Sequence, residues 1–405
     1  MTTEQPTGGR GTGSARRCAI GLETELRAID RAALTPVVAQ ALGDRSAVVQ
    51  DWRGEPLAGG IGVALGANTL HRFSGTARVG DGIRPWSLVL KVLRPPAADA
   101  RAGDPTDPDY WKREALVYRS GLLDGLPDGL AAPRCYGVVE RAEGTWLWLE
   151  EVADRVGAPW PLATFGDAAR HLGRFNGAYL AGRPLPAVPW LSRSVLRPRI
   201  AATAALWERY DDLRDRPLFR RGWPGGLAER ARRVWADRDR FAAALEALPR
   251  VLRHGDADRR NLFARRTADG SPETVAIDWA VVGPGPVGDE VATLVAASVL
   301  WAQGVGPADL PELSRTCFAG YLAGLRDAGW AGEERPVRLG YAATLGLRWG
   351  PLAGITVAVT ADADWRARTE ATLGISFEEM LDRYARMQPF LLAQADEARR
   401  LLGPS

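Results

Sequence analysis

Hydrophobic and polar residues alternate over much of the first 150 positions of the chain, which is typical of strands in a half-buried sheet. This alternation predicts five strands, at 48–57, 68–79, 86–93, 132–139 and 145–149. Apolar residues spaced three and four apart predict a helix at 22–42, with Pro36 as its expected breaking point, and another at 110–120. The pattern therefore predicts a small antiparallel sheet accompanied by helices.

From Pro161 onward the apolar spacing changes to that of helices. Helices are predicted at 165–180, 200–210, 226–248 and from 291 to the end. The apolar run Val275–Ile277 predicts a short strand, and the repeat Gly283–Pro286 predicts a rigid loop. The fold class that follows is α+β, with the sheet in the N-terminal half and a mostly helical C-terminal half.

Composition narrows the function classes. The 52 basic and 49 acidic residues nearly cancel, which argues against a nucleic-acid partner. Three cysteines lie far apart, so we expect no disulfide framework and no zinc site. Residues 1–17 lack the apolar core of a signal peptide, and the longest apolar run, Val291–Ala302, is too short to cross a bilayer. We expect a cytoplasmic protein without a membrane partner; its oligomeric state is open.

The segment Arg253–Trp279 carries the strongest chemical pattern. Asp256 is followed five residues later by Asn261, and Asp278 closes the apolar run before it. Phosphoryl transfer from a nucleotide needs a carboxylate that orients the attacking hydroxyl, and an acid and an amide that hold Mg²⁺. The three residues supply this set in the order that protein kinases use. An ordinary turn and a capped helix is the competing interpretation.

A glycine-rich stretch lies between the first two predicted strands. Its glycines can bend the backbone over phosphates and present N–H groups to them; they are Gly59, Gly60, Gly62 and Gly66. An ordinary glycine-rich turn would have the same composition. Only two lysines occur in the chain, Lys91 and Lys112. Lys91 lies in the third predicted strand between apolar neighbours, so we expect a buried stem and a charge that reaches phosphate oxygens.

These residues together resemble a known family. His254-Gly255-Asp256, then Asn261, then Ile277-Asp278-Trp279 is similar to the aminoglycoside phosphotransferase and choline kinase branch of the protein-kinase-like superfamily. The resemblance covers roughly residues 48–350. It implies a bilobal protein-kinase-like fold, ATP as phosphoryl donor and Mg²⁺ as the metal ion.

The resemblance also implies roles for individual residues. Asp256 would be the catalytic base, and Asn261 and Asp278 the metal ligands. Lys91 would contact the phosphates, with the helix residue Glu114 holding it in place. The glycine-rich stretch would cover the phosphates. The backbone after the last sheet strand, represented by Glu150 and Val152, would read adenine.

The predicted domains follow from the same resemblance. Residues 1–17 are expected to be a flexible tail and 18–45 a helical extension. The nucleotide-binding lobe would span 46–153. The lobe with the catalytic loop, the metal site and the substrate-binding helices would span 154–405.

Several neighbouring residues receive structural interpretations. Arg259 and Arg260 depart from the commoner family pattern. An arginine here could contact the γ-phosphate or an anionic substrate, but we favour the interpretation that both are partners of acids. His254 is expected to brace the loop by hydrogen bonds. Either Asp289 or Glu290 would cap the next helix and brace the loop. Trp146 and Trp148 are expected to pack in the core. His71 and His171 are expected either to pack or to lie at the surface. Lys112 and Arg113 are expected to be exposed.

The function that the sequence favours is transfer of the γ-phosphoryl group of ATP to a hydroxyl of a small molecule. The C-terminal helices mix acids with arginines, which disfavours the strongly acidic pocket that a polycationic aminoglycoside requires. The expected acceptor is an aminoglycoside-, sugar- or amino-alcohol-like molecule. Two alternatives stay open: a kinase acting on a peptide or protein hydroxyl, and a nucleotide-binding regulator without turnover.

Overall fold

The computed structural model describes residues 24–57, 68–95, 103–107, 109–142, 144–193, 196–354, 366–367, 370–371 and 373–403. Contacts divide the chain into two compact units. Among the described residues, unit 1 holds those within 24–57, 69–95 and 134–151, and unit 2 holds those within 103–133 and 152–403. Residues 103–133 thus group with unit 2, whereas the sequence placed them in the 46–153 lobe. The four domain limits themselves stay a prediction.

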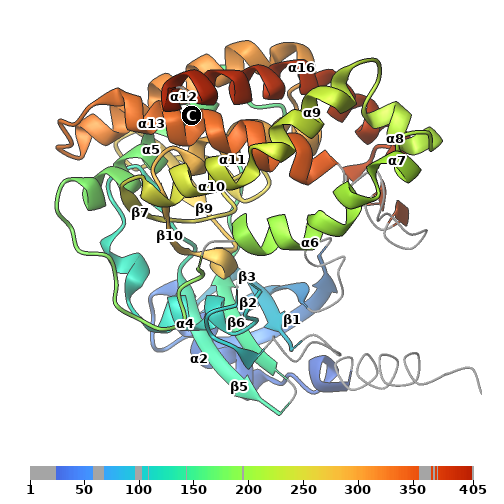
Figure 1. The fold of residues 1–405 in the computed structure, drawn as a ribbon. Coiled ribbons are helices and arrows are strands. Elements are labelled where there is room, and N and C mark those ends of the chain that lie inside the picture. Colours follow the sequence, from blue (N-terminus) through green and yellow to red (C-terminus); the bar gives the residue numbers. More distant parts are fainter. Residues whose placement is uncertain are drawn as a thin grey trace, which may run out of the picture. The chain divides into compact units, whose positions relative to one another are not determined.

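Unit 1 is built on a five-stranded antiparallel sheet of order β1-β2-β3-β6-β5. Its elements are α2 (Arg31–Leu42), β1 (Val48–Pro56), β2 (Thr69–Val79), β3 (Gly82–Leu93), β5 (Cys135–Arg141) and β6 (Gly144–Glu150) (Figure 1). All five predicted strands are present, with ends that shift by up to four residues. Trp146 and Trp148 are 3% exposed and belong to the core under α2, which confirms their packing role.

Helix α2 begins later than predicted and continues through Pro36. The carboxylate of Asp30 accepts a hydrogen bond from Ala33 N (2.8 Å), and the extended backbone of Asp30 separates α2 from the turn before it. The prediction of a break before Pro36 is therefore wrong. A capping aspartate sets the start of this helix, and a proline one and a half turns further on removes only one backbone hydrogen bond.

Unit 2 is mostly helical (Figure 1). Its main helices are α4 (Arg113–Arg119), α5 (Leu162–Leu180), α6 (Leu196–Glu208), α7 (Tyr210–Leu213), α8 (Pro217–Gly222), α9 (Leu227–Ala236), α10 (Arg238–Ala247), α11 (Asp289–Leu300), α12 (Leu310–Asp327), α13 (Glu334–Ala343), the π-helical segment η5 (Thr344–Leu352) and α16 (Phe377–Leu402). The predicted helices 200–210 and 226–248 are each divided, at Arg209 and at Asp237. Together these helices confirm the α+β class. Among the described residues no helix combines the length and apolar character needed to cross a membrane.

Short strands in unit 2 place the loop of interest. β4 (Leu130–Ala131), β9 (Pro272–Ala276) and β8 (Leu262–Arg266) form one sheet in that order. β7 (Arg250–Arg253) pairs antiparallel with β10 (Gly283–Pro286), so the prediction of a rigid loop at Gly283–Pro286 is wrong. A strand is compatible with this sequence because glycines alternate with prolines. Gly283 and Gly285 can supply the N–H groups for pairing, and the prolines need none on the unpaired edge.

Helices α5 and α12 pack closely against each other, and β7 packs against α5. A Cβ atom on Gly173 of α5 would lie 2.2 Å from Tyr321 O of α12, so the backbones approach at a distance that only glycine permits. Tyr321 Oη donates to Asn176 Oδ1 of α5 (2.7 Å), and Asn176 Nδ2 donates to Leu252 O of β7 (2.8 Å). This chain of buried hydrogen bonds fixes β7, which leads directly into the predicted catalytic loop.

Candidate active site

The predicted catalytic loop lies between β7 and β8, and Asp278 lies just beyond β9. Leu262 pairs with Ala276 in the β8–β9 ladder, and Ile277 N donates to Asn261 O (2.9 Å), which extends the pairing by one step. Asn261 and Asp278 therefore flank the same end of the two strands. The spacing in the sequence becomes proximity through a single antiparallel pair.

His254 braces the loop, as predicted. Its Nε2 lies 2.8 Å from Ile277 O, and Asp256 N donates to its Nδ1 (3.3 Å). Because Nδ1 accepts, the ring is neutral with its proton on Nε2, which donates to the carbonyl. The ring also packs edge-on against Trp279, with 4.6 Å between centroids. Both ring nitrogens are thus used within the loop, which leaves proton transfer to another group.

Glu290 is the acid that braces the loop from the following helix. Its carboxylate accepts from His254 N (2.7 Å) and from Gly255 N (3.0 Å). Gly255 has a φ of 87°, and a Cβ atom there would lie 2.7 Å from Val281 O, so the turn requires glycine. Asp289 instead pairs with Arg253. The choice between the two acids, which the sequence left open, falls on Glu290 for the loop.

Asp256 and Asn261 contact each other directly. Asn261 Nδ2 donates to the backbone oxygen and to Oδ2 of Asp256, both at 2.9 Å. Burial raises the pKa of Asp256 to about 7, with the charges of Asp258 and Asp278 adding to the effect and that of Arg260 opposing it. The carboxylate is therefore held in a fixed orientation by the amide, among other charged groups of the same loop.

The donor set beside Asp256 suits Mg²⁺. Because the amide nitrogen of Asn261 donates to Asp256, the amide oxygen lies on the other edge of the group, away from these hydrogen bonds. Asp278 adopts a left-handed backbone (φ 61°, ψ 64°), a strained conformation that is concentrated at functional sites. One carboxylate and one amide oxygen leave room for phosphate oxygens and water around Mg²⁺. Among the described residues, no group of three or more His, Cys, Asp or Glu could hold a metal.

Arg259 has the predicted structural role. Its guanidinium forms an ion pair with Asp154, donates to Leu262 O (3.0 Å) and lies over the ring of Trp160, 4.1 Å from the centroid. These contacts occupy the face and one edge of the guanidinium. Arg259 therefore fastens the loop to the segment that follows Val152.

Arg260 has an equivalent role on its own side of the loop. Its Nε donates to Asp258 Oδ1 (3.0 Å), and it lies over the ring of Trp301, 5.3 Å from the centroid. The interpretation of both arginines as partners of acids is confirmed.

The predicted nucleotide-binding residues of unit 1 lie on two adjacent strands. Lys91 of β3 is opposite Leu70 of β2 and Leu147 of β6, and only 6% of it is exposed, which confirms the buried stem. Glu150 ends β6, and its Oε2 accepts from Arg134 N (3.1 Å). The predicted glycine-rich stretch with Gly59, Gly60, Gly62 and Gly66 lies outside the described residues.

Glu114 and Val152 belong to unit 2. Glu114 lies in the first turn of α4 and is 1% exposed. A carboxylate this deeply buried needs a charged or hydrogen-bonding partner. Its pairing with Lys91 stays a prediction, as does the adenine-reading role of the backbone at Glu150 and Val152.

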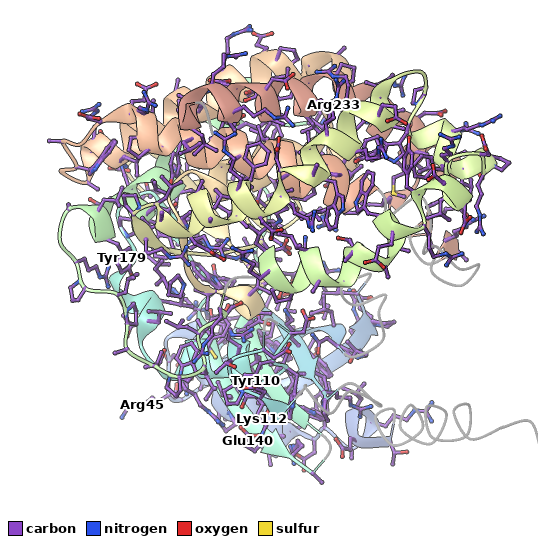
Figure 2. The ribbon with its side chains drawn as sticks, in the orientation of Figure 1. Arg45, Tyr110, Lys112, Glu140, Tyr179 and Arg233 are labelled. Atoms are coloured by element: carbon purple, nitrogen blue, oxygen red, sulfur yellow. The ribbon has the colours of Figure 1, made fainter. Side chains whose placement is uncertain are left out.

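Arg113 corrects a prediction, because it is buried rather than exposed. Its Nε donates to Trp190 O and its Nη1 to Ala280 O, both at 2.7 Å. The guanidinium also lies 5.9 Å from the ring centroid of Tyr110, which Figure 2 labels together with Lys112. Burial lowers the pKa of Arg113 to about 10. No sequence pattern marks this anchor, because its acceptors are backbone oxygens of residues remote along the chain.

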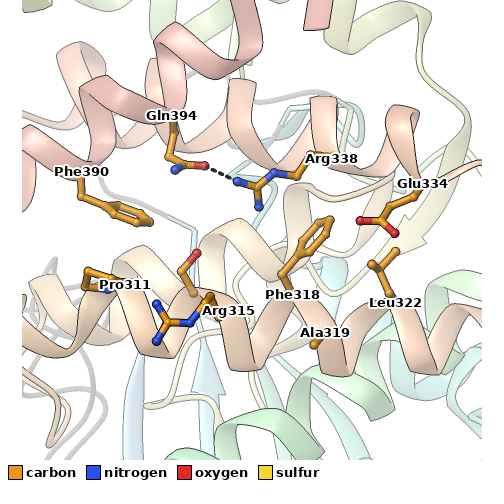
Figure 3. A pocket seen from close by; sticks show the side chains of 10 residues that line it. Pro311, Arg315, Phe318, Ala319, Leu322, Glu334, Arg338, Phe390 and Gln394 are labelled. Carbon is orange, nitrogen blue, oxygen red and sulfur yellow. Dashed lines mark hydrogen bonds between the residues drawn. The ribbon is translucent and has the colours of Figure 1, made fainter. Parts of the chain in front are cut away.

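A pocket of about 430 Å³ lies on another face of unit 2 (Figure 3). Helices α12, α13 and α16 line it, with Phe318, Leu322 and Phe390 as apolar walls. Arg338 donates to Gln394 Oε1 (3.2 Å) at its edge. None of the predicted site residues lines this pocket, so it is separate from the catalytic loop.

Comparison with known proteins gives one family match. A model described as the phosphotransferase enzyme family matches residues 73–333. No curated protein sequence matches the chain at a significant level.

Several solved structures are similar at low identity. An amicoumacin kinase in complex with AMP-PNP, Ca²⁺ and its ligand shares 15% identity over 89% of this chain and 96% of its own, with a TM-score of 0.47. A microcompartment-associated aminopropanol kinase shares 14% over 85% and 94%, with a TM-score of 0.49. A spectinomycin phosphotransferase with ADP and spectinomycin shares 12% over 91% and 99%, with a TM-score of 0.48. Similarity at this level carries no information about the substrate of this chain.

Proposed function

The chain belongs to the phosphotransferase enzyme family, and we propose that it transfers the γ-phosphoryl group of ATP to a hydroxyl of a small molecule. The family resemblance read from the loop around Asp256 is confirmed by this membership. The observation that supports the proposal is the arrangement of three residues at the β8–β9 pair. They are the hydrogen-bonded carboxylate of Asp256, the amide of Asn261 and the strand-end carboxylate of Asp278.

Asp256 orients the acceptor hydroxyl in this proposal and accepts its proton. The hydroxyl oxygen forms a bond to the γ-phosphorus while the bond from that phosphorus to the bridging oxygen of ADP breaks. One hydrogen bond from Asn261 restricts the Asp256 carboxylate and a second holds the backbone oxygen of Asp256, while His254 and Glu290 hold the backbone on its N-terminal side. These contacts keep the base correctly oriented during the transfer. Orientation is the main way in which they favour catalysis.

Asn261 and Asp278 would hold Mg²⁺. When bound, the ion neutralises charge on the phosphate oxygens. The chain contributes one amide oxygen and one carboxylate in a backbone fixed by the Ile277–Asn261 hydrogen bond. The carboxylate of Asp278 belongs to a residue with a left-handed, strained backbone.

Unit 1 would supply the nucleotide contacts. Lys91 would reach the phosphates from β3, with Glu114 as its partner. The glycine-rich stretch with Gly59 to Gly66 would cover them. Backbone groups at Glu150 and Val152 would bind adenine. The proposed role of Lys91 is supported by its burial in the centre of the sheet. Burying a lysine charge is costly unless the charge has a binding partner.

The acceptor class that we propose is a sugar, an amino alcohol or an aminoglycoside-like molecule. We also propose that the enzyme works in the cytoplasm, and that the nucleotide-binding lobe spans 46–153 and the catalytic lobe 154–405.

The test is an acceptor screen with the purified full chain. Mg²⁺-ATP is supplied with aminoglycosides, sugars, amino alcohols and nucleosides, and ADP release is followed. Acceptor-dependent ADP release is expected, and Asp256→Asn should lower kcat by about 10²–10⁴-fold because it removes the base but keeps the shape.

Asp382→Asn is the matched control, since Asp382 of α16 forms an exposed ion pair with Arg221 of α8 (2.7 Å). It should leave kcat unchanged. Full turnover by Asp256→Asn, or failure of the native chain to bind nucleotide, would contradict the proposal.

A further inference from the structure

A small charged cavity of about 30 Å³ lies behind the catalytic loop, within unit 2. It is bordered by β7, α10, α11 and η5. Its polar lining residues are Arg250, Arg253, Arg348, Glu246, Asp289 and Thr344. This volume is larger than one water molecule requires, so the cavity has room for a water molecule or a small ion.

The lining carries more positive than negative charge. Three of the residues are arginines and two are acids. Glu246 is already bound from outside by Arg197, whose Nε and Nη2 donate to its two oxygens at 2.8 and 2.9 Å. Asp289 is then the one lining carboxylate left to balance the arginines, and it is shared.

Arg253 and Arg348 share Asp289. Arg253 forms an ion pair with one carboxylate oxygen, and Arg348 Nη1 lies 3.6 Å from the other, with a hydrogen bond to Thr293 Oγ1 (3.1 Å). The Nε atoms of both arginines are buried and have no hydrogen-bond partner among the described residues. The two side chains are only 4% and 7% exposed. Burying such donors unmatched is costly, so a missing acceptor is indicated.

Electrostatics point in the same direction. Burial lowers the pKa of Arg253 to about 10, and the positive charges of Arg348 and Arg250 lower it further against the opposing effect of Glu290. Water would satisfy the free N–H groups but would not reduce this repulsion. A negative ion would do both.

We propose that this cavity binds a halide-sized inorganic anion, with chloride as the physiological ligand. The anion accepts hydrogen bonds from Arg253 and Arg348 and stabilises the end of β7, from which His254 and the catalytic loop continue. The site depends neither on nucleotide nor on the acceptor, so its failure and that of the proposed function are separable.

The direct test is crystallography of the full chain grown in sodium bromide and, separately, in sodium gluconate. Bromide scatters anomalously, and gluconate is too large for the cavity. The expected result is an anomalous peak in bromide within the cavity lined by Arg253 and Arg348. A cavity that holds water only, with no anomalous peak, would overturn the proposal.

A second test measures thermal unfolding at constant ionic strength as chloride replaces gluconate. With a dissociation constant of tens of millimolar, 200 mM chloride should raise Tm by about 2–4 °C. Arg348→Met removes one cavity arginine and should abolish the rise. Arg221→Gln, which removes an exposed arginine paired with Asp382, should retain it. Equal Tm values in both salts, or a rise that persists in Arg348→Met, would refute the anion site.

Discussion

Two clusters of arginine and aspartate flank the catalytic loop, and they differ in charge balance. In the first, here called the paired cluster, each arginine has its own acid: Arg259 pairs with Asp154, and Arg260 with Asp258. Each guanidinium also lies over a tryptophan ring. The paired cluster is neutral, and its donors have partners on several sides.

In the second, here called the shared cluster, Arg253 and Arg348 divide a single carboxylate, that of Asp289. Both arginines are more deeply buried than those of the paired cluster, yet each has an unmatched Nε. A buried ion pair costs desolvation but leaves no net charge, whereas two arginines that share one carboxylate rely on charges further away, such as that of Glu290, for the rest of their balance. The shared cluster should therefore depend on its carboxylate and on any bound anion far more than the paired cluster does.

The largest effect is expected from Asp289→Asn, which breaks the shared cluster. It leaves the two buried arginines with only more distant negative charges, such as that of Glu290, and we expect a loss of about 3–5 kcal/mol in the free energy of unfolding. Urea denaturation measures this loss. Chloride should restore part of it, since the cavity then carries a larger positive charge. A loss below that of Asp382→Asn on the surface would contradict the charge imbalance.

A smaller effect is expected from Asp154→Asn in the paired cluster. Arg259 keeps its hydrogen bond to Leu262 O and its contact with Trp160, and both partners of the ion pair are partly accessible to solvent. We expect a loss of about 2 kcal/mol, and no chloride dependence. A double-mutant cycle with Arg259→Met isolates the pair. Recovery by chloride would show that the two clusters do not differ as described.

The smallest effect is expected where a two-to-one arrangement is exposed. Arg170 and Arg174 both donate to Asp327, at 2.6 and 2.8 Å, and their hydrogen bonds lower the pKa of Asp327 from 3.8 to about 2. Solvent screens these charges, so Asp327→Asn should cost only about 1 kcal/mol at pH 7, less in high salt.

The pH dependence of that cost has a defined sign. Unfolded Asp327 binds its proton near pH 3.8 and folded Asp327 near pH 2, so its contribution is complete above pH 3.8 and is lost as the pH falls towards 2. The difference in unfolding free energy between native chain and Asp327→Asn should shrink over that window. A difference that stays constant from pH 6 to pH 2.5 would rule out this ion pair as its source.

The sequence was sufficient for the strands around the predicted catalytic loop and for the proximity of its polar residues. Asp256, Asn261 and Asp278 are spaced so that one antiparallel pair, β8–β9, brings them together. Strand alternation in the first 150 residues likewise depends on neighbours along the chain. Local spacing encodes such features because the contacts that form them are close in sequence.

Other features were decided by residues far apart in the chain. Arg113 is buried because carbonyl groups of Trp190 and Ala280 meet its guanidinium, and no pattern near Arg113 announces them. Gly283–Pro286 is a strand because β7 lies beside it. A glycine–proline repeat limits which backbone conformations are possible, and the neighbouring strand decides which of them forms.

The sequence by itself determined which chemical groups this protein has and the order in which they occur, because residue type and local spacing fix both. Only the tertiary structure decided how charges are shared among them. Glu290 rather than Asp289 braces the loop, and Asp289 serves two arginines, one of them on η5 almost sixty residues later. Burial makes this sharing of charges energetically important, because an unpaired charge costs little free energy in water and a great deal inside the protein.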